Sequence, residues 1–148
     1  LSGMIDRTHK GSLLPEFTVS DAAGRKLRLA DLKGKPLLIN LWATWCAPCV
    51  VEMPLLNQLA RQRSAALKVV TISQDMQQTE KVAALMKQRG FDRLEPWLDP
   101  ENDLVFHYNA GTLPATIYYG ADGREIWRYV GGLDWTGPEA ATMLAEAR

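Results

Sequence analysis

The sequence predicts an α/β fold with a central mixed sheet flanked by helices. Short apolar runs rich in β-branched residues alternate with amphipathic stretches, a pattern typical of parallel strands joined by helices. Two pairs of strand-like segments, one near each end of the chain, are joined by short turns and predict hairpins. The 148 residues, 47% of them hydrophobic, suit one globular domain with its own core. We expect this domain to span 14–148, after a flexible arm or linker stub over the polar, aperiodic residues 1–13.

The domain is expected to begin with a hairpin. Polar and apolar residues alternate in Leu14–Val19 and again in Lys26–Leu29, which predicts its two strands. A single helical turn or a loop at Ala30–Gly34 then leads to Pro36–Trp42. The nearly continuous apolar character of this last run indicates a buried strand.

Two helices with a strand between them are expected next. Val50–Ser64 carries apolar residues at three-to-four spacing, although Pro54 inside it should kink or re-aim the helix. Leu67–Ile72 is short, apolar and β-branched, as in a buried strand. Gln78–Arg89 has one apolar helical face and ends at Gly90, a common helix stop.

The last part of the chain predicts a small element, a hairpin and a helix. A short strand at Trp97–Leu98 precedes a short helix at Asn102–Tyr108. Strands at Ala115–Tyr119 and Glu125–Val130 are joined by a glycine-containing turn, so we expect an antiparallel edge there. Pro138–Ala147 predicts a final helix with proline in its first turn.

The charge balance excludes some classes of function. Lys plus Arg number 17, and so do Asp plus Glu. A broad nucleic-acid surface needs a basic excess, so we expect no nucleic-acid partner.

No apolar run approaches the roughly 20 residues that span a bilayer. Because the chain starts at Leu1 rather than Met, we expect that an N-terminal segment was removed or left out.

The only two cysteines, Cys46 and Cys49, lie between a predicted strand and a predicted helix. Unpaired N–H groups and the helix dipole at such a position stabilise a thiolate. The second sulfur lies one turn further on, close enough to bond to the first. We assign Cys46 as the exposed attacking sulfur and Cys49 as the shielded resolving thiol. Pro48 suits the first helical turn, where its missing N–H has no partner to lose, and it stiffens the loop.

Roles for the cysteine pair outside redox chemistry are disfavoured. A disulfide that closes a loop of two residues removes little entropy from the unfolded chain, so it would be a poor structural staple. A zinc site needs four ligands, and only His9 and His107, both far along the sequence, remain to complete one. Two unpaired core cysteines are a further alternative. The flanking Trp42, Trp45 and Pro48 favour redox chemistry over both metal binding and simple packing.

The run Trp42–Cys49 resembles the active-site run of the thioredoxin superfamily. Its continuation through Glu52–Pro54 is similar to the TlpA and ResA branch of membrane-tethered bacterial thioredoxin-like proteins. The resemblance extends from Leu14 to the final helix. It implies a thioredoxin-like fold with an N-terminal β-hairpin and a central insertion, here Asp75–Asn109. We expect neither a cofactor nor a bound metal.

The resemblance also implies a substrate-binding loop. Gly111–Ile117 matches the family's cis-proline site, with Pro114 as the proline. A cis turn leaves the Leu113 backbone free to pair with an extended substrate beside the cysteines. Thr112 in the same loop and Trp45 next to the first cysteine complete the expected substrate-binding residues.

Glu52 matches a glutamate that the branch places near its redox pair. It stands three residues after Cys49, so its carboxylate is expected to accept the proton of that thiol during resolution. Plain thioredoxins carry a buried acid six residues before the first cysteine, where this chain has Asn40. Because an amide cannot act as a base, the role falls to Glu52. The alternative is that Glu52 is an ordinary solvated helix residue.

By the same resemblance, the expected function is a periplasmic reductant of protein disulfides in cytochrome c maturation or respiratory copper-site assembly. A membrane thiol transporter would supply electrons to the domain, a monomer tethered to the inner membrane by a segment outside this chain. An oxidant or isomerase on the same fold is an alternative, because direction depends on the reduction potential. A copper chaperone would use wider cysteine spacing with a nearby histidine. A peroxidase would surround its cysteine differently.

Overall fold

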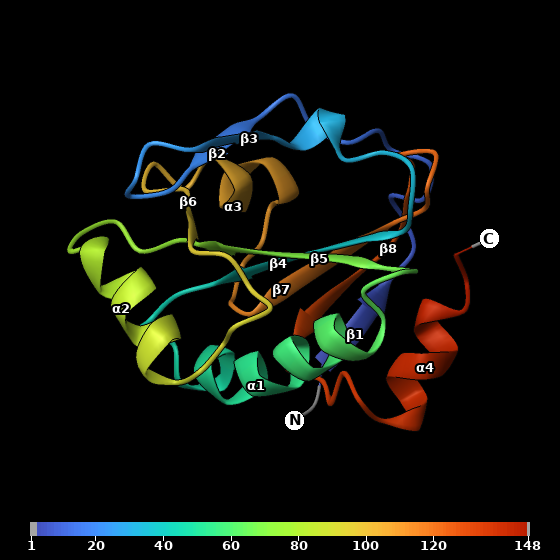
Figure 1. The fold of residues 1–148 in the computed structure, drawn as a ribbon. Helices are drawn as coiled ribbons and strands as arrows, with labels where there is room; N and C mark the ends of the chain where they lie inside the picture. The colour runs from blue at the N-terminus through green and yellow to red at the C-terminus, as the bar shows by residue number, and fades with distance from the viewer. Residues whose placement is uncertain (1–2, 148) are drawn as a thin grey trace.

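The computed structural model describes residues 3–147, which form one eight-stranded mixed sheet with helices on both faces (Figure 1). The strands are β1 (Gly3–Asp6), β2 (Thr18–Ser20), β3 (Lys26–Arg28), β4 (Leu37–Trp42), β5 (Lys68–Ser73), β6 (Trp97–Leu98), β7 (Ala115–Tyr119) and β8 (Glu125–Gly131). The helices are η1 (Leu29–Asp31), α1 (Ala47–Gln62), α2 (Glu80–Gln88), α3 (Asp103–Tyr108) and α4 (Pro138–Leu144). The strand order is β1-β8-β7-β4-β5-β6-β2-β3. The predicted fold class is confirmed.

The centre of the sheet is β4, which is buried along its whole length. It pairs in parallel with β5, where Ile39 lies opposite Val70, and antiparallel with β7, where Ile39 lies opposite Ile117. A strand covered on both faces needs apolar residues at nearly every position, which explains its continuous apolar run. The two expected hairpins belong to this same sheet, since Ser20 of β2 lies opposite Leu98 of β6.

Two apolar cores lie on opposite faces of the sheet (Figure 1). One contains the apolar side chains of α1, α2 and α4 together with Leu38 and Trp127 of the sheet. The other contains those of α3 and η1 together with Ile39 and Trp97. Leu38 and Ile39 are neighbours that point to opposite faces, as the alternation of a strand requires.

The expectation of a flexible arm is wrong over Gly3–Asp6, which forms β1 and pairs antiparallel with β8. Leu1 and Ser2 lie outside the described residues. β1 therefore occupies the edge that was expected for the late hairpin. A Cβ added at Gly3 would clash with the Val130 carbonyl and the Tyr129 ring, so the close approach of β1 depends on this glycine. Leu13 also forms an isolated bridge to Arg124.

The boundary that matters most for function is the start of α1. This helix begins at Ala47, three residues before the predicted Val50, and continues through Pro54 to Gln62. The last helix ends at Leu144 rather than Ala147. In residues 3–147, none of the helices is long and apolar enough to cross a bilayer.

Candidate active site

Cys46 and Cys49 lie where β4 passes into α1. Cys46 is the N-cap residue of the helix, with extended backbone angles, and its N–H donates to the Ala43 carbonyl at 3.2 Å. The backbone N–H of Cys49 donates to the Cys46 sulfur at 3.3 Å. The two residues are joined as a disulfide, with Cα atoms 5.2 Å apart. Pro48 lies in the first turn of the helix, as the sequence predicted.

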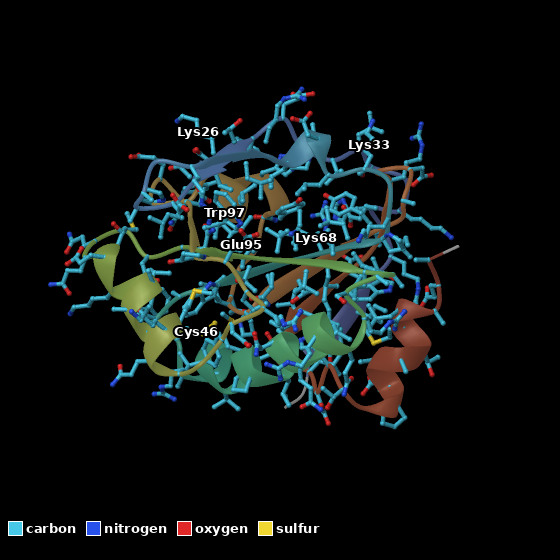
Figure 2. The ribbon with its side chains drawn as sticks, viewed as in Figure 1. Lys26, Lys33, Cys46, Lys68, Glu95 and Trp97 are labelled. Atoms are coloured by element: carbon cyan, nitrogen blue, oxygen red, sulfur yellow. A yellow bond between two sulfur atoms is a disulfide. The ribbon has the colours of Figure 1, made fainter. Side chains whose placement is uncertain are left out.

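Cys46 is more buried than the sequence suggested, whereas Cys49 is shielded as expected. The exposed fraction is 5% for Cys46 and 0% for Cys49. Cys46 is the more accessible of the two, but the expectation of an exposed sulfur is wrong in absolute terms. Its sulfur is covered partly by the loop before β7, because it lies 3.7 Å from the Leu113 carbonyl oxygen. Figure 2 shows Cys46 on the side of the molecule where α2 lies.

Asp75, which follows β5, holds the turn before the cysteines. Its carboxylate accepts the Thr44 backbone N–H at 2.9 Å, the Thr44 hydroxyl, and the Ser73 hydroxyl at 2.6 Å. Asp75 is 5% exposed, so these three donors replace its water. The sequence analysis did not identify this contact. A signal for it exists, because β4 and β5 are parallel neighbours and polar residues at their carboxyl ends meet.

The loop before β7 lies against the disulfide. The Leu113–Pro114 peptide bond is cis, as predicted. Pro114 is buried and its carbonyl accepts the Gly131 N–H at 2.9 Å. Leu113 is half-buried and Thr112 is exposed. Among the described residues, neither backbone group of Leu113 bonds to another backbone group. The loop thus leaves backbone hydrogen-bonding capacity next to the Cys46 sulfur.

Glu52 is completely buried one helical turn after Cys49, so it is not a solvated helix residue. Its Oε1 accepts the side-chain N–H of Asn40 at 3.1 Å, and its Oε2 accepts the backbone N–H of Leu133 at 3.0 Å. Asn40 also donates to the Thr116 hydroxyl at 3.0 Å. These bonds join α1 to β4, to β7 and to the segment after β8.

Burial raises the pKa of Glu52 to about 7, because the charged form loses its hydration. The Trp135 indole, the Leu133 N–H and Asn40 stabilise the carboxylate and oppose this shift. The Trp135 indole N–H makes no hydrogen bond to any described residue, so it stabilises the carboxylate only through its dipole. A carboxyl group with a pKa near neutrality can both accept and release a proton under physiological conditions.

Three candidates remain, namely Trp45, His9 and His107. Trp45, the residue before Cys46, is 71% exposed. His9 and His107 do not approach the cysteines as metal ligands, since no group of three or more His, Cys, Asp and Glu side chains in residues 3–147 is arranged to hold a metal. His107 packs instead against Phe17 and Tyr108.

Comparison with known proteins agrees with this geometry. A model of the AhpC/TSA family matches residues 11–124. A thiol–disulfide oxidoreductase ResA of Bacillus cereus is 33% identical over 123 residues, which cover 82% of this chain and 69% of that protein. ResA of Bacillus subtilis is 31% identical over 120 residues, covering 79% and 65%. Among solved structures, a DsbF homologue from Corynebacterium diphtheriae superposes with a TM-score of 0.78 at 18% identity, over 99% of this chain and 92% of that one.

The family match spans most of the chain and includes the cysteine pair, and the curated relatives are similar over much of the same length. The matched residues contain the Cys46–Cys49 disulfide at the start of α1 and the loop before β7 that lies against it. This chain belongs to the AhpC/TSA family of thioredoxin-like proteins and is a thiol–disulfide oxidoreductase of the ResA type.

Proposed function

We propose that this domain reduces disulfides of partner proteins, with Cys46 as the attacking sulfur and Cys49 as the resolving one. The observation that carries the proposal is the position of the pair at the start of α1, with the buried acid Glu52 one turn beyond it. In the reduced protein, the Cys46 thiolate attacks one partner sulfur and the other partner sulfur leaves. The Cys49 thiolate then attacks Cys46 and releases the first partner sulfur. Two electrons pass to the partner, and the Cys46–Cys49 disulfide forms.

Glu52 serves the second step of this sequence. Cys49 is completely buried, so its proton has no direct route to water. Glu52 lies on the neighbouring position of the same helix face, where side chains three residues apart meet. With a pKa of about 7, it takes the Cys49 proton as that thiol attacks.

The charge next to the cysteines favours the reducing direction. An ionised Glu52 one helical turn from Cys49 disfavours a second negative charge on that thiol, so it destabilises the reduced dithiol relative to the disulfide. A pair whose reduced form is less stable gives up electrons more readily.

The substrate is held beside Cys46 by two features. The free backbone groups of Leu113 pair with an extended substrate segment, in the manner of strand addition, and Pro114 and Thr112 flank them. Trp45 adds an exposed aromatic surface next to the sulfur. Protein substrates therefore suit this site better than small disulfides alone.

The cellular role that we propose follows the relatives. A ResA-type protein would act in the periplasm or its equivalent, with apocytochrome c cysteines or copper-site assembly proteins as substrates. A membrane thiol transporter would re-reduce it. We further propose that the domain is a monomer whose full-length form is tethered to the inner membrane.

The reduction potential tests the direction. The protein is equilibrated with glutathione buffers of graded ratio, and the reduced fraction is measured by alkylation of free thiols. We expect half-reduction at or below about −230 mV, in the range of glutaredoxins and thioredoxin. A value near the roughly −120 mV of the strong dithiol oxidants would make this protein an oxidant instead.

Trapping tests the two sulfur roles. Cys49→Ser removes the resolver, so partners should stay bound to Cys46 as mixed disulfides in cells that express the variant. Cys46→Ser is the matched control and should trap none. Equal trapping by both variants would contradict the assignment.

A further inference from the structure

The indole N–H of Trp135 is a buried donor without a partner. Trp135 lies in the segment after β8 and is 1% exposed. Within the described residues its Nε1 makes no hydrogen bond. An unpaired N–H in an apolar core costs free energy, and such groups are rare in folded proteins. The presence of this one therefore requires an explanation, and the residues around Trp135 supply it.

The segment that contains Trp135 already bonds to Glu52. The backbone N–H of Leu133 donates to Glu52 Oε2 at 3.0 Å. The side chain of Asn40 donates to the other oxygen, Oε1, at 3.1 Å. A carboxylate has about four lone-pair sites, so the two oxygens of Glu52 can accept further bonds. The indole of Trp135 is close enough to this carboxyl group to lower its pKa. An unused donor and unused acceptor sites thus lie close together in the same core.

Aromatic packing holds the Trp135 indole in place. Its ring stacks on Trp127, with ring centroids 6.2 Å apart and planes inclined by 13°, and it meets the Tyr129 ring at 74°. Trp127 is itself fixed, because its Nε1 donates to the Met143 carbonyl at 3.2 Å. Of the two stacked indoles, the one with an unused N–H among residues 3–147 is therefore the one beside Glu52. A ring that its neighbours hold loses little further freedom when its N–H forms a bond.

The groups around Glu52 leave it as the acid that titrates near neutrality in the oxidised protein. Cys46 and Cys49 on its own helix are joined as the disulfide and carry no proton. Burial is the main cause that raises the pKa of Tyr129 on β8, so this phenol stays neutral. Hydrogen bonds to its carboxylate lower the pKa of Asp134 on the segment after β8, so this exposed group stays ionised. The facing side chains from β4 and β7 are uncharged, namely Asn40 and Thr116.

We propose that Trp135 is a positioning residue of the resolving step. Its indole N–H donates to the Glu52 carboxylate when Glu52 is ionised, and this bond is lost when Glu52 takes up the Cys49 proton. The bond favours the base form of Glu52, which is the form that the attacking thiol needs. In this step one proton passes from Cys49 to Glu52, the Cys49 sulfur bonds to Cys46, and the partner sulfur leaves with the electron pair of the broken bond. The inference rests on the proposed function, since it assigns a residue to the proton transfer of that step.

The indole N–H resonances of the oxidised protein, which has five tryptophans, test the bond directly. The Trp135 signal should move downfield as pH rises, with a midpoint near the pKa of Glu52, about 7. The Trp127 signal should stay in place, because its N–H is bonded to a backbone carbonyl. In Glu52→Gln the Trp135 signal should lose its titration. A Trp135 signal that ignores pH in the wild-type protein, or that titrates equally in Glu52→Gln, would overturn the proposal.

Phenylalanine at Trp135 and at Trp127 supplies a matched pair of variants. Each replaces one of two stacked, buried indoles by a phenyl ring, but Trp135→Phe alone removes the N–H beside Glu52. In the oxidised protein, Trp135→Phe should raise the pKa of Glu52 by about one unit, read from its infrared carboxyl band. Trp127→Phe should lower the denaturation midpoint, because a bond to Met143 is lost, and leave this pKa unchanged. Equal pKa shifts in the two variants would assign the effect to aromatic packing and refute the role of the N–H.

The symmetric disulfide of 5-thio-2-nitrobenzoate reports on the reaction itself. The reduced protein should release one equivalent of the coloured thiolate when Cys46 attacks and a second when Cys49 resolves the adduct. In Trp135→Phe the pH midpoint of the second release should rise by about one unit, so that its rate at about pH 7 falls about fivefold, while the first release keeps its rate. An unchanged second release would count against the role of Trp135. If the wild-type protein releases a single equivalent, the resolving step of the proposed function fails, whatever the indole signals show.

Discussion

Replacing Glu52 by Gln should remove a large pH dependence of stability. In the folded protein the pKa of Glu52 is raised to about 7, and the ordinary value is 4.5. Between these two values the folded state binds more protons than the unfolded state. The free energy of unfolding therefore falls as pH rises. The unfolded glutamate ionises freely in this range, whereas the folded protein must either keep Glu52 protonated or bury its charge. The contribution is fully present below pH 4.5 and is lost as pH passes 7.

The size of the effect follows from the shift. Each pKa unit corresponds to about 1.4 kcal/mol, so a shift of about 2.5 units is worth about 3 kcal/mol in total. Part of it is already lost at about pH 5, where an unfolded glutamate is mostly ionised. Between about pH 5 and pH 8 we expect the wild-type protein to lose about 2 to 3 kcal/mol more than Glu52→Gln.

Urea unfolding of the oxidised protein at half-unit pH steps measures this difference. Keeping the disulfide intact removes thiol ionisation from the comparison. The amide of the Glu52→Gln variant would place its NH₂ against either Asn40 or the Leu133 N–H, which lowers stability at every pH, so the slopes and not the absolute values are compared. Replacement of the exposed Glu101 by Gln is the control and should follow the wild-type slope. Parallel curves for wild type and Glu52→Gln would refute a neutral buried acid at this position.

Three further predictions concern the surroundings of the site. Asn40→Leu removes a donor to the Glu52 carboxylate and should raise the pKa of Glu52 by about one unit, measured from its infrared carboxyl band; an unchanged titration would count against the hydrogen bond. Asp75→Asn turns one acceptor into a donor facing Thr44 or Ser73, and should cost about 1 to 3 kcal/mol in urea unfolding, whereas a neutral result would mean that the turn is held by other contacts. Gly3→Val should detach β1 and speed amide hydrogen exchange along the outer side of β8, without changing cysteine alkylation in the reduced protein; unchanged exchange would show that β1 tolerates a side chain there.

Sequence patterns predicted the inner sheet because its strands are specified locally. The apolar run of β4 and the β-branched run of β5 are each distinctive enough to favour a buried strand over a helix. The strand β1 lacks such a signal. Its residues Gly3–Asp6 show no alternation, and the pairing with β8 joins segments more than 120 residues apart. Such a strand is stabilised almost wholly by its partner, so its own composition resembles that of a loop.

The residues of the site also differ in whether a local sequence pattern predicts them. The cysteines, Pro48 and Pro114 were identified because their spacing is contained in short motifs. The Asp75 contact to Thr44 was missed, since it joins two strand ends through a hydrogen bond that no local pattern encodes. The burial of Cys46 was missed for a similar reason, because the loop that contains Leu113 comes from a distant part of the chain.

The interpretation of Asn40 differs most between the sequence and the structure. In the sequence it is the one polar residue in the run that forms β4, and it marks only the lack of an acid at that position. In the structure it donates to both Glu52 and Thr116, while its own Oδ1 has no partner within the described residues. Once Glu52 is protonated, its new O–H is a donor in need of an acceptor, and rotation of the Asn40 amide would present Oδ1 to it. An aspartate in this place would put a second carboxyl against the first, and the two would share protons as a coupled pair. An amide instead leaves Glu52 as the single titrating acid behind Cys49, with an unused acceptor close by for the proton that it takes up.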